Sequence, residues 1–429
     1  MIYLDNNATT ATDPAVIDTL TETLRSGPAN ASSLHRSGQS AAAAVSGAID
    51  RIGRSLGLRF ADPGCPRLIL TSGGTESNNT AVTGIAADRP LLISRIEHPS
   101  ILAAATEQSA HQSTRQPADP STRPRNRNRP VHWIDVTAAG VVDTDHLDRQ
   151  LTTIGQTAST IGQTTPTVGQ ATPTTSSDHN VTAVVAVMAA NNETGILQPI
   201  ESVAEICRRH NAHLHIDATQ TIGKLPTDWS ALPFGSVTFA AHKFHGPPGI
   251  GGLILAPGVE VQPIVHGGGQ QLQSRGGTEP VALIVAMAHA LSIATDNMTQ
   301  DVRHLQSLRD RFESALSAGD DSAPGPRQIF FHGRGIDRLP QTTCVSMIGA
   351  DRQSMLMAMD MAGVAASSGS ACSSGSSPPS HVLTAMGCPE DQIHSALRFG
   401  VSKWTTQTEV DSAAAVVLRC YRRLCRNMN

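Results

Sequence analysis

Short apolar runs alternate with amphipathic stretches through the first two thirds of this 429-residue chain. The runs are four to eight residues long and rich in Leu, Ile and Val, which is typical of buried strands. The predicted strands are 67–70, 90–94, 181–188, 212–216 and 236–239. Between them, stretches such as 200–210 (IESVAEICRRH) place their apolar positions on one face of a helix. This alternation predicts an α/β fold with a mostly parallel sheet covered by helices.

The last third of the chain has a different pattern. Helical periodicity at 281–317 and 407–426 flanks one strand-like run at 341–348 (QTTCVSMI). We therefore expect a second, smaller α+β domain in this part of the chain. It contains the run SSGSACSSGS (367–376), where one cysteine stands among glycine and serine residues that suit a loop rather than a helix or strand.

One region interrupts the sheet pattern. Residues 111–130 are rich in Arg, Pro, Gln and Asn, and residues 153–173 contain a seven-residue near-repeat (TIGQTAS, TIGQTTP, TVGQATP). Glycine and proline within the repeats argue against a coiled coil. We interpret 152–180 as a disordered or loosely packed surface insertion. Between the two polar segments, 131–151 predicts a strand, a turn and a short helix.

Composition narrows the class of protein. Apolar residues at 39% and charged residues at 16% are typical of a globular protein, and the net charge of −4 gives no reason to expect a nucleic-acid partner. No apolar run reaches the length of a membrane span, and the start MIYLDNNATT does not resemble a secretory signal. The seven cysteines are scattered without a CxxC pair, so we predict no disulfide framework, no metal site and a reducing cytoplasmic location.

The motif TSGGTE (71–76) predicts an anion site. It follows a predicted strand and opens a probable helix, whose first backbone N–H groups favour a phosphate. Glycine at Gly74 permits close approach, and Thr75 adds a hydroxyl group. Taken alone, the motif is equally compatible with an ordinary glycine-rich turn between a strand and a helix.

Two further motifs follow predicted strands. Asp217 and Gln220 stand in HIDATQ, and Lys243 stands in FAAHKFHGPPGIG, between a strand and a Gly/Pro loop. A buried lysine beside a cationic neighbour has a lowered pKa and can form a Schiff base. Alone, the aspartate is equally well read as a helix cap. Together, however, the three motifs match the three groups of pyridoxal 5'-phosphate. A lysine binds its aldehyde, an anion site binds its phosphate, and a carboxylate pairs with its pyridinium nitrogen.

At this point the chain resembles the NifS/IscS-type cysteine desulfurases of the class V aminotransferase family. The stretches that carry the resemblance are YLDNNATT (3–10), TSGGTESNN (71–79), EHPS (97–100), NNETG (191–195), DATQTIGKLP (217–226), HKFHGPPGIG (242–251), GGGQ (267–270), RGGTE (275–279), SSGSACSSGS (367–376) and LRFG (397–400). They cover nearly the whole chain except 111–180. The resemblance implies a fold-type I pyridoxal-phosphate-dependent transferase. Its large cofactor-binding domain would span 13–262, and its small domain, with the cysteine loop, would comprise 1–12 and 263–429.

The resemblance also implies roles for individual residues. Lys243 would carry the cofactor as a Schiff base, Asp217 would pair with the ring nitrogen, and His98 would stack on the ring and move protons. The further cofactor contacts it implies are Asn192 and Gln220 to the phenolic oxygen, Gly74, Thr75 and His242 to the phosphate, and Thr278 to the phosphate from the other subunit of a homodimer. Ala240 stands where the family usually has Ser or Thr, so we expect weaker cofactor retention.

The implied substrate is L-cysteine. Arg398, with Asn192, would bind its carboxylate, a task that suits a guanidinium. Cys372 would attack the substrate sulfur, leave as a persulfide as L-alanine is released, and carry the sulfur to an acceptor or scaffold protein on a flexible Gly/Ser tether. Transient contact of Cys372 with an iron–sulfur cluster is left open, as is an inert role for this thiol.

The implied function is a cysteine desulfurase that supplies sulfur for iron–sulfur cluster assembly or tRNA thiolation. Two alternatives remain. The first is a selenocysteine lyase or another class V enzyme on the same fold, although a pure aminotransferase has no need of Cys372. The second is a non-catalytic scaffold that only binds the cofactor, against which the intact Lys243, His98, Asp217 and Arg398 argue.

Overall fold

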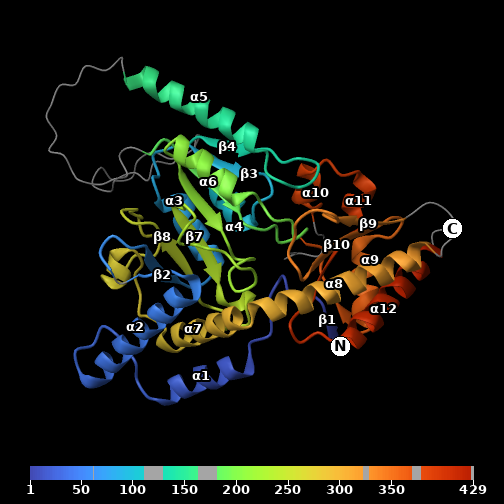
Figure 1. Cartoon of the computed structure of the whole chain (residues 1–429), viewed down its shortest axis with the longest axis horizontal. Helices are drawn as coiled ribbons and strands as arrows, with labels where there is room; N and C mark the ends of the chain where they lie inside the picture. The colour runs from blue at the N-terminus through green and yellow to red at the C-terminus, as the bar shows by residue number, and fades with distance from the viewer. Residues whose placement is uncertain (61, 111–128, 163–180, 322–327, 370–377, 427–429) are drawn as a thin grey trace.

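The computed structural model describes residues 1–60, 62–110, 129–162, 181–321, 328–369 and 378–426 (Figure 1). Two bodies lie side by side in this view. One is built on a large sheet, and the other is a smaller α+β unit that contains the first strand and the last described helix of the chain. Helix α8 (Met298–Asp321) leads from the first body into the second.

The central sheet has the strand order β2-β8-β7-β6-β5-β3-β4. Six of its strands run in the same direction, and β8 is antiparallel to both of its neighbours. The strands are β2 (Arg67–Thr71), β3 (Leu91–Ser94), β4 (Val131–Ile134), β5 (Val184–Met188), β6 (His213–Asp217), β7 (Ser236–Ala240) and β8 (Gly251–Leu255). The five strands predicted from apolar runs and the mostly parallel sheet are confirmed, as is the α/β class.

Strand β8 has no counterpart among the predicted strands. Its sequence begins with two glycines, which normally weaken a strand. The structure shows why they are needed: a Cβ atom on Gly251 would lie 2.7 Å from the carbonyl oxygen of Phe239 and 2.8 Å from the Cα atom of Gly73. The glycine therefore permits the turn before helix α3 (Gly74–Gly84) to approach the sheet closely.

Helices cover both faces of the sheet. Helices α2, α5, α6 and α7 pack on one face with the main apolar core, joined by Val16 of α1, while α3 and α4 pack on the other face. Their bounds are α1 (Pro14–Arg25), α2 (Arg36–Leu56), α4 (Pro99–Ala110), α5 (Thr144–Gly162), α6 (Ile200–Arg209) and α7 (Val281–Asp296). Because the sheet is covered on both sides, its strands are apolar on both faces, which matches the continuous runs in the sequence.

The predicted insertion needs a correction. Residues 152–162, interpreted as disordered or loosely packed, form the end of α5, so this helix is not short. Its apolar positions explain the difference, because Leu147 and Leu151 are buried and Ile154 packs against the same core, at the spacing of one helical face. The other predictions for the two polar segments concern residues 111–128 and 163–180, which lie outside the described residues.

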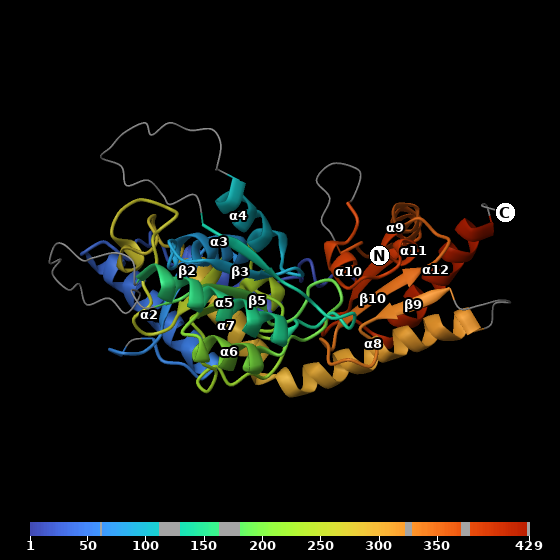
Figure 2. The same cartoon turned by 90° about the horizontal axis from the view of Figure 1, so that it is seen from above.

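The small body contains a three-stranded antiparallel sheet, β12-β10-β9, and a parallel pair, β1-β11. Its strands are β1 (Ile2–Tyr3), β9 (Ile329–His332), β10 (Thr342–Met347), β11 (Val364–Ala365) and β12 (Ala396–Gly400). Besides α8, its helices are α9 (Arg352–Met361), α10 (His381–Ala385), α11 (Glu390–His394) and α12 (Gln407–Arg426). Figure 2 shows β9 and β10 beside α8, and a second apolar core joins these elements to Leu4 near the chain start.

The residue boundary between the two domains stays a prediction, and we propose to shift it. The sequence assigned everything from 263 onward to the small domain. Buried residues of α7, such as Ile284 and Leu291, pack in the core of the large sheet, whereas α8 packs in the second core through residues such as Leu308 and Phe312. We therefore place the boundary between α7 and α8.

In the described part of the chain no single helix is long and apolar enough to cross a membrane. The bent pair α7–α8 has the length and the apolar composition of a membrane span, and nothing beyond length and composition supports such a role.

Candidate active site

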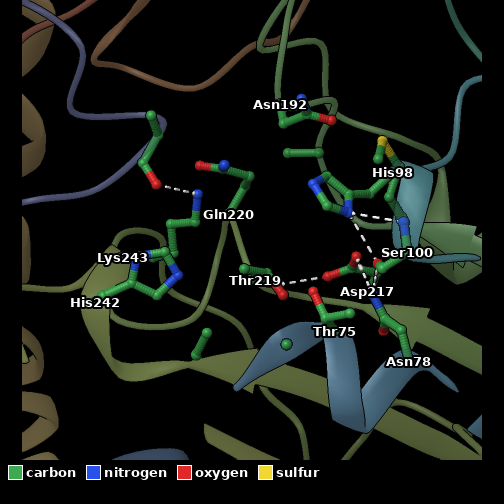
Figure 3. Close-up of a pocket in the computed structure, with 15 residues that line it drawn as sticks. Thr75, Asn78, His98, Ser100, Asn192, Asp217, Thr219, Gln220, His242 and Lys243 are labelled. Atoms are coloured by element: carbon green, nitrogen blue, oxygen red, sulfur yellow. Dashed lines mark hydrogen bonds between the residues drawn. The ribbon is translucent and has the colours of Figure 1, made fainter. Parts of the chain in front are cut away.

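A cavity of about 230 Å³ opens at the carboxyl ends of three neighbouring strands. Met188 ends β5, Asp217 ends β6 and Ala240 ends β7, and all three residues line the cavity. This edge is where open α/β sheets bind ligands. The other lining residues are Ala8, Gly74, Thr75, Asn78, His98, Ser100, Ala190, Asn192, Thr219, Gln220, His242 and Lys243 (Figure 3).

One wall of the cavity is the N-terminus of α3. Gly73 occupies the cap position with a φ of +152° that favours glycine, and no side chain caps the helix. The first N–H groups of the helix are therefore available to an anion. Glu76 in this first turn does not oppose the anion's charge, because its carboxylate accepts the backbone N–H of Ser72 and forms an ion pair with Arg275 at 2.9 Å.

Asp217 lies deep in the cavity and is 5% exposed. Its Oδ1 atom accepts the backbone N–H of Thr219 at 2.9 Å, and its Oδ2 atom accepts the side-chain amide of Asn78 at 2.8 Å. Two donors thus hold the carboxylate in one orientation at the end of β6 (Figure 3). The hydroxyl oxygen of Thr219 is buried beside it and has no hydrogen-bond partner in the described part of the chain.

His98 stands just before α4, and its ring lines the cavity opposite Asp217 (Figure 3). The backbone N–H of Ser100 donates to its Nδ1 atom at 3.1 Å, and the Ser100 hydroxyl lies 2.8 Å from the same atom. Burial is the main cause that lowers the pKa of His98. A neutral ring that accepts at Nδ1 carries its proton on Nε2, so His98 can donate a proton from that nitrogen.

Lys243 follows β7 in the short 3₁₀ helix η2 (Ala241–Lys243). Its Nζ atom donates to the backbone carbonyls of Asn7 at 2.6 Å and Ala8 at 2.7 Å, so the N-terminal segment forms part of the site. Burial, together with the positive charge of Arg398, lowers the pKa of Lys243 to about 8, against the opposing effects of Asp217 and Asp5. A substantial fraction of this amine is therefore neutral near physiological pH.

Arg398 is buried next to the cavity without lining it. Its guanidinium forms an ion pair with Asp5 at 2.8 Å and donates to the backbone oxygen of Asn192 at 3.0 Å. Among the described residues, neither the Nε atom of Arg398 nor the side-chain oxygen of Asn192 has a hydrogen-bond partner, and both atoms are buried. Such groups are costly to bury, so they indicate a site prepared for a polar ligand.

The structure brings together most of the residues singled out from the sequence. Those that line the one cavity are Gly74, Thr75, His98, Asn192, Asp217, Gln220, His242 and Lys243. Thr278 is exposed and does not line it, so its expected action across a dimer stays a prediction. Cys372 lies outside the described residues.

Sequence reasoning gave no role to Asn78, Ser100 or Thr219. All three lie within motifs already singled out, but they bond to catalytic candidates rather than standing out by residue type. The only available signal was spacing: Asn78 lies four residues after Gly74, and so on the same face of α3.

Comparisons with known proteins agree with this geometry. The family model "Aminotransferase class-V" matches residues 2–175 and 163–412. A cysteine desulfurase of Sinorhizobium fredii is 34% identical, over 99% of this chain and 97% of its own length, and the cysteine desulfurase IscS of Dictyoglomus turgidum is 30% identical, over 99% and 95%. The structure of a NifS-like protein from Rickettsia africae is similar at a TM-score of 0.78 and 28% identity, covering 98% of this chain and 99% of that one.

These matches extend over nearly the full chain, and they confirm the resemblance seen in the sequence motifs and the fold-type I architecture. Proteins of this kind generally depend on pyridoxal phosphate. The chain belongs to the class-V aminotransferase family and, within it, to the cysteine desulfurases.

Proposed function

We propose that this protein is a pyridoxal-phosphate-dependent cysteine desulfurase. It converts L-cysteine to L-alanine, receives the sulfur as a persulfide on Cys372, and passes it to an acceptor or scaffold protein for iron–sulfur cluster assembly or tRNA thiolation. One observation carries the proposal: the amine of Lys243, the carboxylate of Asp217 and the N-terminus of α3 face a single cavity. A chain with this arrangement that is 34% identical to a curated cysteine desulfurase is well suited to the same reaction.

The residues of the cavity fit the cofactor. The uncapped N-terminus of α3, with the unpartnered hydroxyl of Thr219 beside it, suits the phosphate. Gln220 donates one amide N–H to the backbone oxygen of Asn7 and accepts from Lys224, so its orientation is fixed and its second N–H would be left for the phenolic oxygen. Asp217, whose side chain is held in one orientation by two donors, suits the ring nitrogen of the cofactor. His242 would complete the phosphate contacts.

When bound, the cofactor supplies an electron-accepting ring that stabilises negative charge on the substrate Cα atom. The residues of the chain prepare this chemistry. Lys243 offers a neutral amine to the aldehyde and then a base for the substrate's α-proton. His98 carries a proton on Nε2 at the face of the cavity and can deliver it to a substrate atom.

Substrate binding is assigned to Arg398. A carboxylate bound there would satisfy the unpartnered Nε atom, and the ion pair of Nη2 with Asp5 holds the guanidinium in place. Asn192 provides a second polar contact next to it. The substrate would thus be oriented with its amino group towards Lys243.

Sulfur transfer is assigned to Cys372 on the grounds of its sequence motif. The Cys372 thiolate attacks the substrate sulfur and forms an S–S bond, while the bond between that sulfur and the substrate Cβ breaks. The electron pair of the broken bond stays on the carbon, which takes up a proton and leaves as alanine. An external thiol or an acceptor cysteine then removes the outer sulfur from the enzyme.

The proposal also includes a cytoplasmic location and a homodimeric assembly. We place the protein in the cytoplasm, because all six cysteines among the described residues are free thiols. A homodimer would bring Thr278 of one subunit to the phosphate of the other. Exposed apolar side chains on and after α1, among them Ile17, Leu24 and Leu34, offer surface for such an association.

The test is to incubate the purified protein with L-cysteine and dithiothreitol and to measure alanine and sulfide. We expect equal amounts of the two products from the wild type. Cys372→Ser should still change its visible absorbance when cysteine is added but should form no persulfide, because a serine hydroxyl is not ionised near neutral pH. Absence of alanine from cofactor-loaded wild type would favour the scaffold alternative, and a large preference for selenocysteine would favour the lyase.

A further inference from the structure

One buried amide joins two of the catalytic candidates. Asn78 lies on α3, is 2% exposed and lines the cavity. Its Nδ2 group donates to Asp217 Oδ2 at 2.8 Å and to Ser100 Oγ at 3.0 Å (Figure 3). An amide nitrogen has two N–H groups, so both are used, one in each direction.

The orientation of this amide is fixed from both sides. The flipped amide would place an oxygen against the carboxylate of Asp217, which repels it. On the other side, Asn78 Oδ1 lies 3.1 Å from Nε2 of His215 and accepts its proton. Burial lowers the pKa of His215 to about 4, so its ring is neutral and carries that single proton. Its Nδ1 atom therefore accepts the hydroxyl of Ser236 at 2.9 Å.

The second N–H group of Asn78 is connected to His98 through Ser100. Because Ser100 Oγ accepts from Asn78, its own proton is free to point to Nδ1 of His98, 2.8 Å away. The backbone N–H of Ser100 donates to the same nitrogen. Both donors stabilise the neutral ring with its proton on Nε2, so the amide of Asn78 acts on the imidazole through one hydroxyl group.

We propose that Asn78 is a positioning residue that couples Asp217 to His98. Its two N–H groups hold the Asp217 carboxylate, which would pair with the pyridinium nitrogen of the cofactor, and, through Ser100, the His98 tautomer that donates from Nε2. This inference rests on the proposed function, which gives Asp217 and His98 their tasks. It predicts different effects for two variants. Loss of the Asn78 amide disturbs both Asp217 and His98, whereas loss of the Ser100 hydroxyl disturbs His98 alone.

The experiment compares Asn78→Ala and Ser100→Ala with Thr83→Ala. Thr83 lies on the same helix, and its hydroxyl bonds only to a backbone carbonyl, so its variant controls for changes in helix stability. The effect on Asp217 is measured as the dissociation constant for pyridoxal phosphate. The effect on His98 is measured as the titration midpoint of its ring by NMR, in holoenzyme carrying ¹³C-histidine. The His98 signal is assigned by its loss in His98→Gln. Neither measurement depends on turnover.

We expect Asn78→Ala to weaken cofactor binding about tenfold to a hundredfold, since it removes a hydrogen bond to a charged group. The same variant should raise the His98 midpoint by about half to one pH unit, because a donor that favours the neutral ring is disturbed. Ser100→Ala should raise the midpoint by a similar amount and leave cofactor binding within about twofold of the Thr83→Ala value.

The coupling is overturned if Asn78→Ala matches Thr83→Ala in both measurements, or if Ser100→Ala weakens cofactor binding as much as Asn78→Ala does. Should Asn78→Ala fail to fold by circular dichroism, the His98 midpoint of Ser100→Ala still decides: an unchanged midpoint refutes the inference and a raised one supports it. A wild type that binds the cofactor but releases no alanine would refute the proposed function, whereas both measurements of the coupling would still be possible.

Discussion

Ala240→Ser should tighten binding of pyridoxal phosphate. Ala240 ends β7, is 1% exposed and lines the cavity next to the N-terminus of α3. Its methyl carbon lies 3.7 Å from the point where a Cβ atom on Gly74 would stand. A serine hydroxyl at this position would therefore lie beside the helix N–H groups that we assign to the phosphate, and the backbone would need no change.

The magnitude follows from one hydrogen bond. A net gain of about 0.5–1.5 kcal/mol corresponds to a dissociation constant about two- to twelvefold lower. We expect the lower half of this range, because the hydroxyl of Thr219 lies close to the same point, 3.2 Å from the position of a Gly74 Cβ atom. In the cofactor-free protein the two hydroxyls can bond to each other, and that bond must be given up on binding.

The assay is an absorbance titration of cofactor-stripped protein with pyridoxal phosphate. Ala240→Cys is the matched control, since a thiol fills similar space but is a weak hydrogen-bond donor. Equal tightening by the cysteine variant would show that volume rather than hydrogen bonding is responsible. An unchanged or weaker affinity of Ala240→Ser would refute the placement of the phosphate beside β7.

Three further predictions concern the amine, the guanidinium and α5. Because the amine of Lys243 must be neutral to attack the aldehyde, borohydride-trapped cofactor should increase with pH around a midpoint of about 8 and level off above it, with the label mapped to Lys243 and to no other lysine. Arg398→Gln should move this midpoint to higher pH, since Arg398 lowers the pKa, and should raise KM for cysteine at least about tenfold; an unchanged KM would remove Arg398 from the substrate site. Leu151→Ala should lower the free energy of unfolding in urea by about 2–5 kcal/mol, whereas exposed Thr152→Ala should change it by about 0.5 kcal/mol or less; equal effects would contradict the packing of α5.

The sequence predicted the site best where a functional side chain directly follows a strand or opens a helix. Asp217 is the last residue of β6, and Lys243 follows the end of β7 in η2. Their positions directly after apolar runs therefore already indicated the carboxyl edge of the sheet, where the cavity opens. The same logic located the uncapped helix at Gly74. The five predicted strands were found because a doubly covered sheet leaves continuous apolar runs.

Features that depend on contacts between distant segments were missed. The role of Asn78 depends on residues 22 and 139 positions away, and no local pattern links them. Strand β8 was not predicted because its glycines are unfavourable in a strand. The reason for Gly251, its close contact with Gly73 before α3, appears only in the folded structure. For 152–162, a repeat rich in Thr and Gly suggested loose structure, while one stripe of Leu and Ile was enough to dock the helix.

The pairing of β1 with β11 has a consequence for how the protein is made. Ile2 pairs with Val364, Asp5 bridges to Gly400, and the carbonyls of Asn7 and Ala8 receive the amine of Lys243. At a synthesis rate of about 5–20 residues per second, some 20–80 s separate translation of this first segment from that of the strand beside it. During that time the first segment has no partner strand, and the pocket around Lys243 lacks one wall. Cofactor loading is therefore expected to follow translation of β12 rather than accompany growth of the chain.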